Sequence, residues 1–282
     1  LNAINNIEKA SKLKGSVTGI PTGFIDLDYK TSGMHPSDLV LIAARPSMGK
    51  TAFVLSMARN MAIDHEAPVA FFSLEMSGKE IAQRLICAYA MISISDFRMG
   101  RISPEQWANI NEATQTLSKL DILIDDTPGT TVTEIRAKSR RMLHNKEKAI
   151  IILDYLQLVS PPPGRRSESR TVEVSEMSRG LKIMAKELKI PLIALSQLSR
   201  APEGRTDKRP MLSDLRESGS IEQDADIVLF LYRDAYYNKE SPTPNISECI
   251  VAKNRHGNTG TVKMIWDGQF TRFSNMEMQH ET

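Results

Sequence analysis

The residues Gly49, Lys50 and Thr51 have the types and spacing of a phosphate-binding loop. They follow the apolar run 39–44, which is short and partly β-branched, and they open a segment with helical spacing. Backbone N–H groups at such a helix start point at an anion. Lys50 is placed to reach the β- and γ-phosphates of ATP or another nucleoside triphosphate, and the Thr51 hydroxyl to ligate Mg²⁺. The residues expected to line the phosphates are Ser47, Met48, Gly49, Lys50 and Thr51.

The loop departs from the usual pattern at one position. Where G-x-x-x-x-G-K-[ST] begins with glycine, this chain has Ala44. Glycine serves there because it tolerates a positive φ or a close backbone approach. We therefore expect this corner of the loop to use angles that an L-residue accepts.

Three further polar residues stand at the ends of predicted strands. Asp154 ends the run 149–154, Glu75 follows 69–74, and Gln197 follows 191–196. Ligands in open α/β sheets bind beyond the carboxyl ends of the strands. Asp154 fits a carboxylate that supports Mg²⁺, Glu75 a base that activates water, and Gln197 a sensor of the γ-phosphate. Each alone is also explained as a cap or a surface residue, but their order behind the loop favours the functional interpretation.

A basic group, Lys253 and Arg255, lies between two predicted antiparallel strands. An exposed arginine at a hairpin tip can act as a finger that completes the site of a neighbouring subunit. From spacing alone, a solvated basic hairpin is the favoured interpretation. Of the five histidines only His256 lies near this group, and we interpret the others as surface or packing residues. The acidic pairs 125–126 and 224/226 are interpreted as strand ends and caps, in preference to metal ligands.

Composition limits the class of protein. The 282 residues are 41% hydrophobic and 25% charged, with a net charge of +2, so nucleic-acid contacts must come from local patches. Cys87 and Cys249 show no metal spacing and are expected to be buried free thiols, which suits a reducing compartment. No apolar stretch reaches ~18 residues, so no membrane span is predicted.

Strands and helices alternate along most of the chain and give way to a β-rich end. This order predicts an α/β fold with a mainly parallel central sheet, helices on both faces and antiparallel strands at the C-terminal end. The segment 18–33 is expected to be loop. Besides the strands above, we expect strands at 121–125, 227–232, 246–253, 260–266 and 269–273, and helices from 50, after Ser77, and over 104–119, 131–143 and 172–189.

Five motifs resemble those of one family, the bacterial replicative DNA helicases of the DnaB type, in their C-terminal RecA-like ATPase domain. They are SLEM at 73–76, LDYLQL at 153–158, SQLSR at 196–200, DLRESGSIEQDAD at 214–226 and AKNRHG at 252–257. The resemblance covers essentially the whole chain, and Ala44 is in keeping with it. It implies a ring-shaped homo-hexamer that hydrolyses ATP with Mg²⁺, moves on single-stranded DNA and unwinds duplex DNA at the replication fork.

The same resemblance implies roles for particular residues. Lys253 and Arg255 act on the adjacent subunit's nucleotide, and Gln197 couples the γ-phosphate to a DNA-facing loop. The residues implied in DNA binding are Arg216, Glu217 and Gly219 in one loop, and Arg165, Arg166 and Arg170 in a second, basic loop. Arginine side chains and free backbone N–H groups bind phosphates without reading bases. For the arginines of the second loop, an ordinary surface segment is an equally good interpretation.

The resemblance also sets the expected domains and partners. Residues 1–15 are expected to form a linker helix that docks on a neighbouring subunit, and residues 16–282 the ATPase domain. Because the chain begins with Leu1, we interpret it as part of a longer protein. The resemblance implies that the full-length protein is cytoplasmic and nucleoid-associated, with a helicase loader and primase as partners. Three alternatives stay open here: a RecA-type recombinase, a small-molecule P-loop kinase, and a nucleotide-gated scaffold without hydrolysis.

Overall fold

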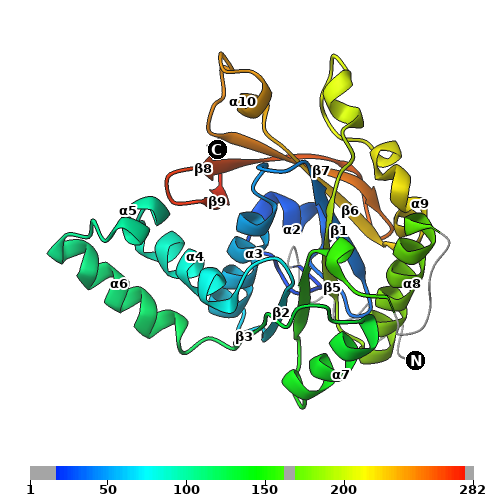
Figure 1. Ribbon diagram of the computed structural model, residues 1–282, viewed down its shortest axis with the longest axis horizontal. Coiled ribbons are helices and arrows are strands. Elements are labelled where there is room, and N and C mark those ends of the chain that lie inside the picture. Colours follow the sequence, from blue (N-terminus) through cyan, green and yellow to red (C-terminus); the bar gives the residue numbers. More distant parts are fainter. Residues whose placement is uncertain (1–16, 162–168, 277–282) are drawn as a thin grey trace.

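The computed structural model describes residues 17–161 and 169–276, and for residues 216–219 it describes the backbone alone. Within these residues, nine strands form one sheet in the order β3-β2-β4-β5-β1-β6-β7-β8-β9 (Figure 1). The strands are β1 (Leu39–Ala44), β2 (Val69–Ser73), β3 (Ile122–Asp125), β4 (Ile150–Asp154), β5 (Leu192–Gln197), β6 (Ile227–Tyr232), β7 (Ile246–Asn254), β8 (Gly260–Asp267) and β9 (Arg272–Asn275).

The pairing of neighbouring strands changes from parallel to antiparallel once, between β6 and β7. Strands β1 to β6 pair in parallel, so their carboxyl ends meet at one edge. Strands β7, β8 and β9 are antiparallel to their neighbours, and Asn254 at the end of β7 pairs with Ile227 at the start of β6. The β7–β8 hairpin loop therefore lies at the opposite edge, beside the amino ends of the parallel strands.

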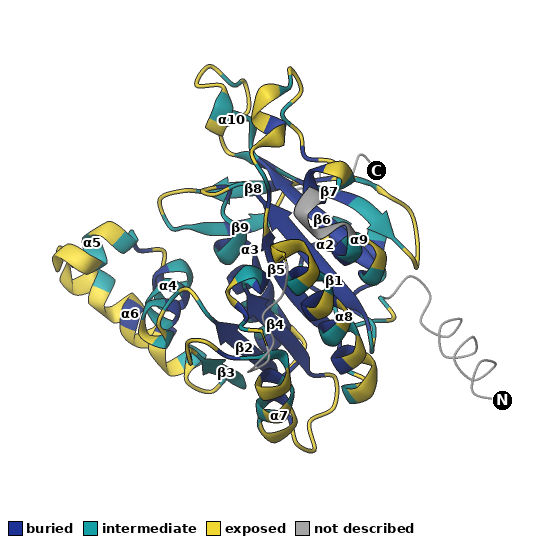
Figure 2. Cartoon of the chain, turned by 45° about the vertical axis from the view of Figure 1, so that its right-hand side comes forward, coloured by how far each residue is buried: buried dark blue, intermediate teal, exposed yellow. Residues whose placement is uncertain are grey.

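Helices cover both faces of the sheet (Figures 1 and 2). Alternate side chains of β1 point to opposite faces: Val40 and Ile42 join a core with α3, while Leu39 and Leu41 join a second core with α8. The helices are α2 (Ile25–Thr31), α3 (Lys50–Asp64), α4 (Gly78–Ala90), α5 (Ile94–Met99), α6 (Pro104–Leu117), α7 (Val132–Met142), α8 (Arg170–Leu188), α9 (Gly219–Asp224) and α10 (Asp234–Tyr237), with 3₁₀ turns η1 (Leu156–Leu158), η2 (Ala201–Gly204) and η3 (Leu212–Ser218).

Helix α3 follows the phosphate-binding loop and is buried along most of its length. Nine of its fifteen residues are buried, among them Phe53, Val54 and Met57. Residues 52–58, nearly two full turns, are all buried, so this part of the helix lies inside the core on every side. Its packing fixes the position of Lys50 and Thr51 at its first turn.

Helices α4, α5 and α6 form a lobe at the side of the sheet, with a small apolar cluster of their own (Figure 1). Ser77 and Glu80 form the predicted capping box at the start of α4, and Pro104 occupies the first turn of α6 as expected. The capping box at Ser77 and a second one at Ser103, before α6, satisfy N–H groups that a helix start leaves unpaired.

The fold class predicted from the sequence is confirmed, but the expectation of a loop over 18–33 is wrong. This segment contains α2, which has no side-chain cap at its start. Its position is held instead by the buried carboxylate of Asp28, which accepts hydrogen bonds from Thr22 N (2.7 Å), Thr22 Oγ1 (2.8 Å) and Gly23 N (3.0 Å). Burial raises the pKa of Asp28, with these hydrogen bonds opposing the rise.

Both cysteines are buried and free, as expected. Burial raises the pKa of the Cys249 thiol to about 12, so this thiol is inert at neutral pH. Across the described residues, no helix combines the length and the apolar character that crossing a bilayer requires.

Candidate functional site

The phosphate-binding loop joins β1 to α3 as the sequence predicts. Gly49 has φ +93° and immediately precedes Lys50, the first residue of α3. Ser47 also has a positive φ, of 65°. Ala44 instead ends β1 in regular register with Gln197. The corner that is usually glycine is therefore ordinary extended backbone, which alanine adopts without strain.

Gly49 is needed for space as well as for its dihedral angle. A Cβ at this position would lie 3.0 Å from the ring of Phe273 and 3.1 Å from that of Trp266. These rings come from β9 and β8, so the antiparallel end of the sheet closes over the loop. The C-terminal strands thereby position the phosphate-binding backbone, which sequence reasoning did not foresee.

Lys50 and Thr51 reach toward the ends of neighbouring strands. Lys50 Nζ donates to the carbonyl of Ser196 at 3.2 Å and lies 4.9 Å from the centre of the Tyr155 ring. Burial lowers the pKa of Lys50, and the carboxylates of Asp154 and Glu75 oppose that shift. The ammonium group is thus held where the phosphate loop, β4 and β5 meet.

Asp154 and Thr51 place two side-chain oxygens next to each other. Thr51 Oγ1 donates to Asp154 Oδ2 at 2.6 Å, and Oδ1 of the same carboxylate is buried without a hydrogen-bond partner. Burial raises the pKa of Asp154, although Thr51 and Lys50 lower it. A buried carboxylate oxygen without a partner beside a hydroxyl fits Mg²⁺, which takes one or two protein oxygens and completes its shell with phosphate and water.

A cleft of 440 Å³ brings these residues together. Its lining includes Lys50, Thr51, Glu75 and Gln197, together with Arg84 of α4. Glu75 and Gln197 are exposed to solvent there, so both can meet a ligand. The arrangement suits phosphate binding, metal binding and activation of a water molecule.

Arg84 is a site residue that sequence reasoning missed. Its Nε is buried without a partner, and burial is the main cause of its lowered pKa. An arginine one residue before the buried Leu85 and three after the buried Ile81 was the available signal. A cation beside the apolar side of a helix needs an anion, and Arg84 lines the cleft where an anion can reach it.

Gln197 connects the cleft to a second, smaller hollow of 50 Å³. That hollow is lined by Gln157, Arg170, Asp214 and Leu215 besides Gln197. Gln157 Oε1 accepts from Gln197 N at 3.4 Å, and its Nε2 donates to Ser196 Oγ at 2.8 Å. Gln197 therefore borders both the cleft and the hollow beside η3.

The residues predicted to bind DNA are only partly described. Arg165 and Arg166 lie outside the described residues. Arg216 and Glu217 lie in η3, where only their backbone is described, and Gly219 is the first residue of α9. Arg170 was predicted in a loop, but it is the first residue of α8, where it donates to Glu173 Oε2 at 2.7 Å and to the carbonyl of Gln157. The predicted start of this helix, at 172, is two residues late because Ser169 caps it by accepting from Val172 N.

Lys253 and Arg255 lie away from the cleft of their own chain. Lys253 Nζ donates to the carbonyl of Glu222 at 2.6 Å, and Arg255 donates to that of Gln223 at 2.7 Å. They stand beside the start of β6, whereas the phosphate loop follows the end of β1, which is parallel to β6. The length of a strand, roughly 3.3 Å per residue, separates them from the cleft.

The acidic pairs carry protein hydrogen bonds, as expected of caps and strand ends. Asp125 Oδ1 accepts from Lys138 at 2.8 Å, and Asp126 accepts from Gly78 N at 2.7 Å at the start of α4. Asp224 accepts from Ser178 Oγ at 2.8 Å, and Asp226 from Leu39 N at 2.8 Å.

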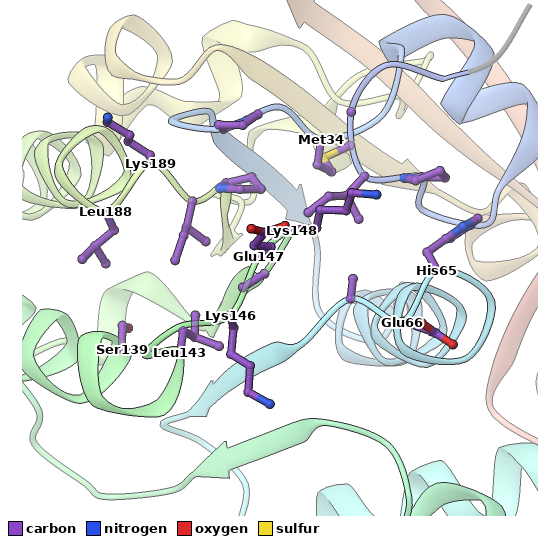
Figure 3. Close-up of a pocket in the computed structure, with 18 of the residues that line it drawn as sticks. Met34, His65, Glu66, Ser139, Leu143, Lys146, Glu147, Lys148, Leu188 and Lys189 are labelled. Carbon is purple, nitrogen blue, oxygen red and sulfur yellow. The ribbon is translucent and has the colours of Figure 1, made fainter. Parts of the chain in front are cut away.

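Another hollow, of 1320 Å³, lies at the opposite edge of the sheet (Figure 3). Side chains of Met34, Leu143, Lys146 and Leu188 surround it, from segments that lead into the strands. No residue of the phosphate loop lines it. Although this hollow is larger than the cleft, it is not the nucleotide site, because it lies away from the phosphate loop.

The fold and the cleft define a RecA-like P-loop ATPase domain. Residues 19–275 match the family described as DnaB-like helicase C terminal domain, and the chain belongs to this family. The replicative DNA helicase DnaB of Geobacillus stearothermophilus is 51% identical over 277 residues, covering 98% of this chain and 61% of that protein. The replicative DNA helicase DnaC of Bacillus subtilis (strain 168) is 50% identical with the same coverage. The chain thus spans about three fifths of the length of these relatives.

Solved structures agree with this assignment. One of them, described as an ATPase domain, superposes with a TM-score of 0.93 at 45% identity, covering 98% of each chain. A DnaB-like replicative helicase described with its interactions with primase superposes with a TM-score of 0.92 at 45% identity, covering 98% of this chain and 66% of that one. The recombinase and kinase alternatives are not favoured by these matches.

Proposed function

We propose that this chain is the motor domain of an ATP-dependent DNA helicase, which assembles as a ring, moves on single-stranded DNA and unwinds duplex DNA at the replication fork. One observation carries the proposal. The cleft and the basic pair Lys253 and Arg255 lie at opposite edges of one sheet, so each chain presents a cleft and a distant basic hairpin. A second copy, turned to bring its hairpin to this cleft, completes the site, and repeating that contact closes a ring.

In this proposal the cleft residues divide the chemistry of ATP hydrolysis. The N–H groups of Ser47, Met48 and Gly49 cradle phosphates, and Lys50 and Arg84 balance phosphate charge. Thr51 and Asp154 would hold Mg²⁺, which would neutralise charge that develops on the phosphates. Glu75 takes the proton of the attacking water.

Gln197 links hydrolysis to DNA. Its side chain borders the cleft, and its neighbour Gln157 borders the hollow that η3 and α8 share. A change at the γ-phosphate can thus shift the segment that contains Arg216, Glu217 and Gly219. Arg165, Arg166 and Arg170 supply a second contact with the DNA backbone.

The further partners follow the same proposal. The assembly is a homo-hexamer in the cytoplasm. Residues 1–15, for which the sequence predicts a linker helix, lie outside the described residues. A helicase loader and primase act on the full-length protein. One solved relative, a DnaB-like replicative helicase, is described together with its interactions with primase, which supports that partner.

The test is the rate of ATP hydrolysis against protein concentration, with and without single-stranded DNA. The proposal predicts that the rate per chain rises cooperatively with concentration and rises again with DNA. A rate per chain that is flat in concentration and indifferent to DNA would contradict it. Displacement of a strand from a forked duplex, measured in parallel, separates a helicase from a strand-pairing ATPase.

A further inference from the structure

Two histidines and an aspartate converge at the edge of the sheet opposite the ATP cleft. Side-chain ligand atoms of His35, Asp38 and His256 all lie within 4.8 Å of one another. His256 comes from the β7–β8 hairpin, more than two hundred residues away in sequence from the other two. His256 Nε2 lies 2.9 Å from Asp38 Oδ1, and His35 Nδ1 lies 3.7 Å from Asp38 Oδ2.

The backbone sets two of the three groups in place. Residues 35–38 form a tight turn in which Asp38 N donates to the carbonyl of His35 at 3.1 Å. Pro36 in the second position and a φ of 73° at Ser37 in the third fit a type II turn. The turn brings the side chains of its first and last residues, His35 and Asp38, to the same side.

One ring nitrogen of His35 has no hydrogen-bond partner. Its Nδ1 is buried without a hydrogen-bond partner, while its Nε2 lies 2.9 Å from Thr18 Oγ1. If Nε2 carries the proton and donates to Thr18, Nδ1 turns a lone pair toward the Asp38 carboxylate. If Nδ1 carries the proton, its nearest carboxylate oxygen, at 3.7 Å, is beyond hydrogen-bond range. A cation between the two groups removes the conflict in the first tautomer.

The donor set matches a divalent transition metal. Two imidazole nitrogens and one carboxylate oxygen suit Zn²⁺, with a water molecule in the fourth position. A point between atoms no more than 4.8 Å apart lies within about 3 Å of each, so small torsional changes reach the ~2.0–2.2 Å of zinc coordination. Thr18 supplies the outer hydrogen bond that metal-bound histidines usually make.

The Asp38 carboxylate is buried between the two histidines. Asp38 is only 4% exposed. Its Oδ1 lies 2.9 Å from His256 Nε2, and its Oδ2 accepts from the backbone N–H of His35 at 3.3 Å. A carboxylate that is this deeply buried is stabilised by a cation beside it.

We propose that His35, Asp38 and His256 form a binding site for a divalent transition metal ion of the Zn²⁺ type, separate from the Mg²⁺ site of the cleft. The ion joins the turn that leads into β1 to the β7–β8 hairpin. It also holds the loop that contains Arg255. Any effect of the ion on the neighbouring subunit's site, through Arg255, rests on the function proposed above.

The test is calorimetric titration of nucleotide-free, chelator-treated protein with Zn²⁺ in excess Mg²⁺, which prefers oxygen ligands and occupies the cleft. We expect one Zn²⁺ per chain. His256→Asn and His35→Gln should each weaken binding at least ~100-fold, and Thr18→Val, which removes only the outer hydrogen bond, about 10- to 100-fold. His144→Asn, an exposed histidine outside this cluster, is the matched control and should bind as the parent does.

Two results would overturn the proposal. One is the absence of stoichiometric Zn²⁺ binding to the parent chain. The other is binding that survives His35→Gln and His256→Asn as well as it survives His144→Asn. Co²⁺ provides a second readout, because a four-coordinate site gives visible absorption bands that must disappear in the two ligand variants. Neither readout depends on ATP hydrolysis, so the metal site and the proposed motor function succeed or fail separately.

Discussion

The hydroxyl of Thr51 and the carboxylate of Asp154 meet at 2.6 Å, although 103 positions separate them along the chain. Thr51 belongs to the first turn of α3, and Asp154 is the last residue of β4. The second carboxylate oxygen, Oδ1, is buried and has no partner. This pair places a carboxylate oxygen without a partner beside the phosphate loop, and we propose that it holds Mg²⁺ there.

Asp154→Asn should separate stability from activity. A folded-state pKa above the ordinary value means that the ionised carboxylate costs stability at neutral pH, and that this cost grows as pH rises from the unfolded to the folded pKa. The variant should therefore melt no lower than the parent without nucleotide, while Mg²⁺-dependent ATP hydrolysis falls at least ~100-fold. Thermal melts and steady-state rates check this. A large drop in melting temperature would show that the carboxylate stabilises the fold instead.

Glu75→Gln should abolish turnover and spare nucleotide binding. The amide keeps the size of the side chain but cannot accept a proton from water, a contribution of about 10²–10⁴ in rate. Single-turnover hydrolysis and the dissociation constant of a fluorescent ATP analogue measure the two effects. Unchanged hydrolysis would remove Glu75 from the role of base.

Gly49→Ala should damage both the fold and the site. The new Cβ would meet the Phe273 ring at 3.0 Å at a φ of +93°, and we expect the free energy of unfolding to fall by roughly 1–3 kcal/mol. Gly204→Ala is the control, because a Cβ there has no atom within 4 Å and φ is not positive. Urea unfolding of both variants is the measurement. Equal effects would contradict the role assigned to Gly49.

The ion pair between Asp125 and Lys138 should make stability depend on pH. Burial would raise the pKa of Asp125, but hydrogen bonds from Lys138 and Thr127 hold it below its ordinary value. The stabilisation is therefore present above pH ~4 and is lost as pH falls toward the folded pKa. Lys138→Met should cost about 1 kcal/mol at pH 7 and less at pH 3, as seen by urea unfolding. A cost that is the same at both pH values would exclude this cause.

Local patterns predicted most of the fold, because apolar runs and caps act over a few residues. The run Ile227–Tyr232 is a strand with the predicted bounds, and the capping box at Ser77 forms as expected. Helix α2 escaped prediction because it is seven residues long and depends on the buried Asp28 and its partners. A local sequence pattern does not reveal stabilisation that comes from contacts formed only in the folded chain.

The same limit applies to the site. Lys50, Thr51, Glu75 and Gln197 line one cleft, as the rule for strand ends predicted. The position of Arg255 at the opposite edge follows only from the pairing of β6 with β7, and the contact of His35 with His256 joins segments more than two hundred residues apart. Neither relationship has a signature in local sequence.

The most direct test of the shared site is a mixture of two inactive variants, Lys50→Ala and Arg255→Ala, combined before assembly. In random rings of equal amounts, about a quarter of the interfaces pair an intact cleft with an intact hairpin. The account predicts that the mixture hydrolyses ATP faster than the sum of the separate variants. Co-purification through a tag on one variant confirms that the two assemble together. A rate equal to that sum, from rings shown to be mixed, would contradict completion of the site by a neighbouring chain.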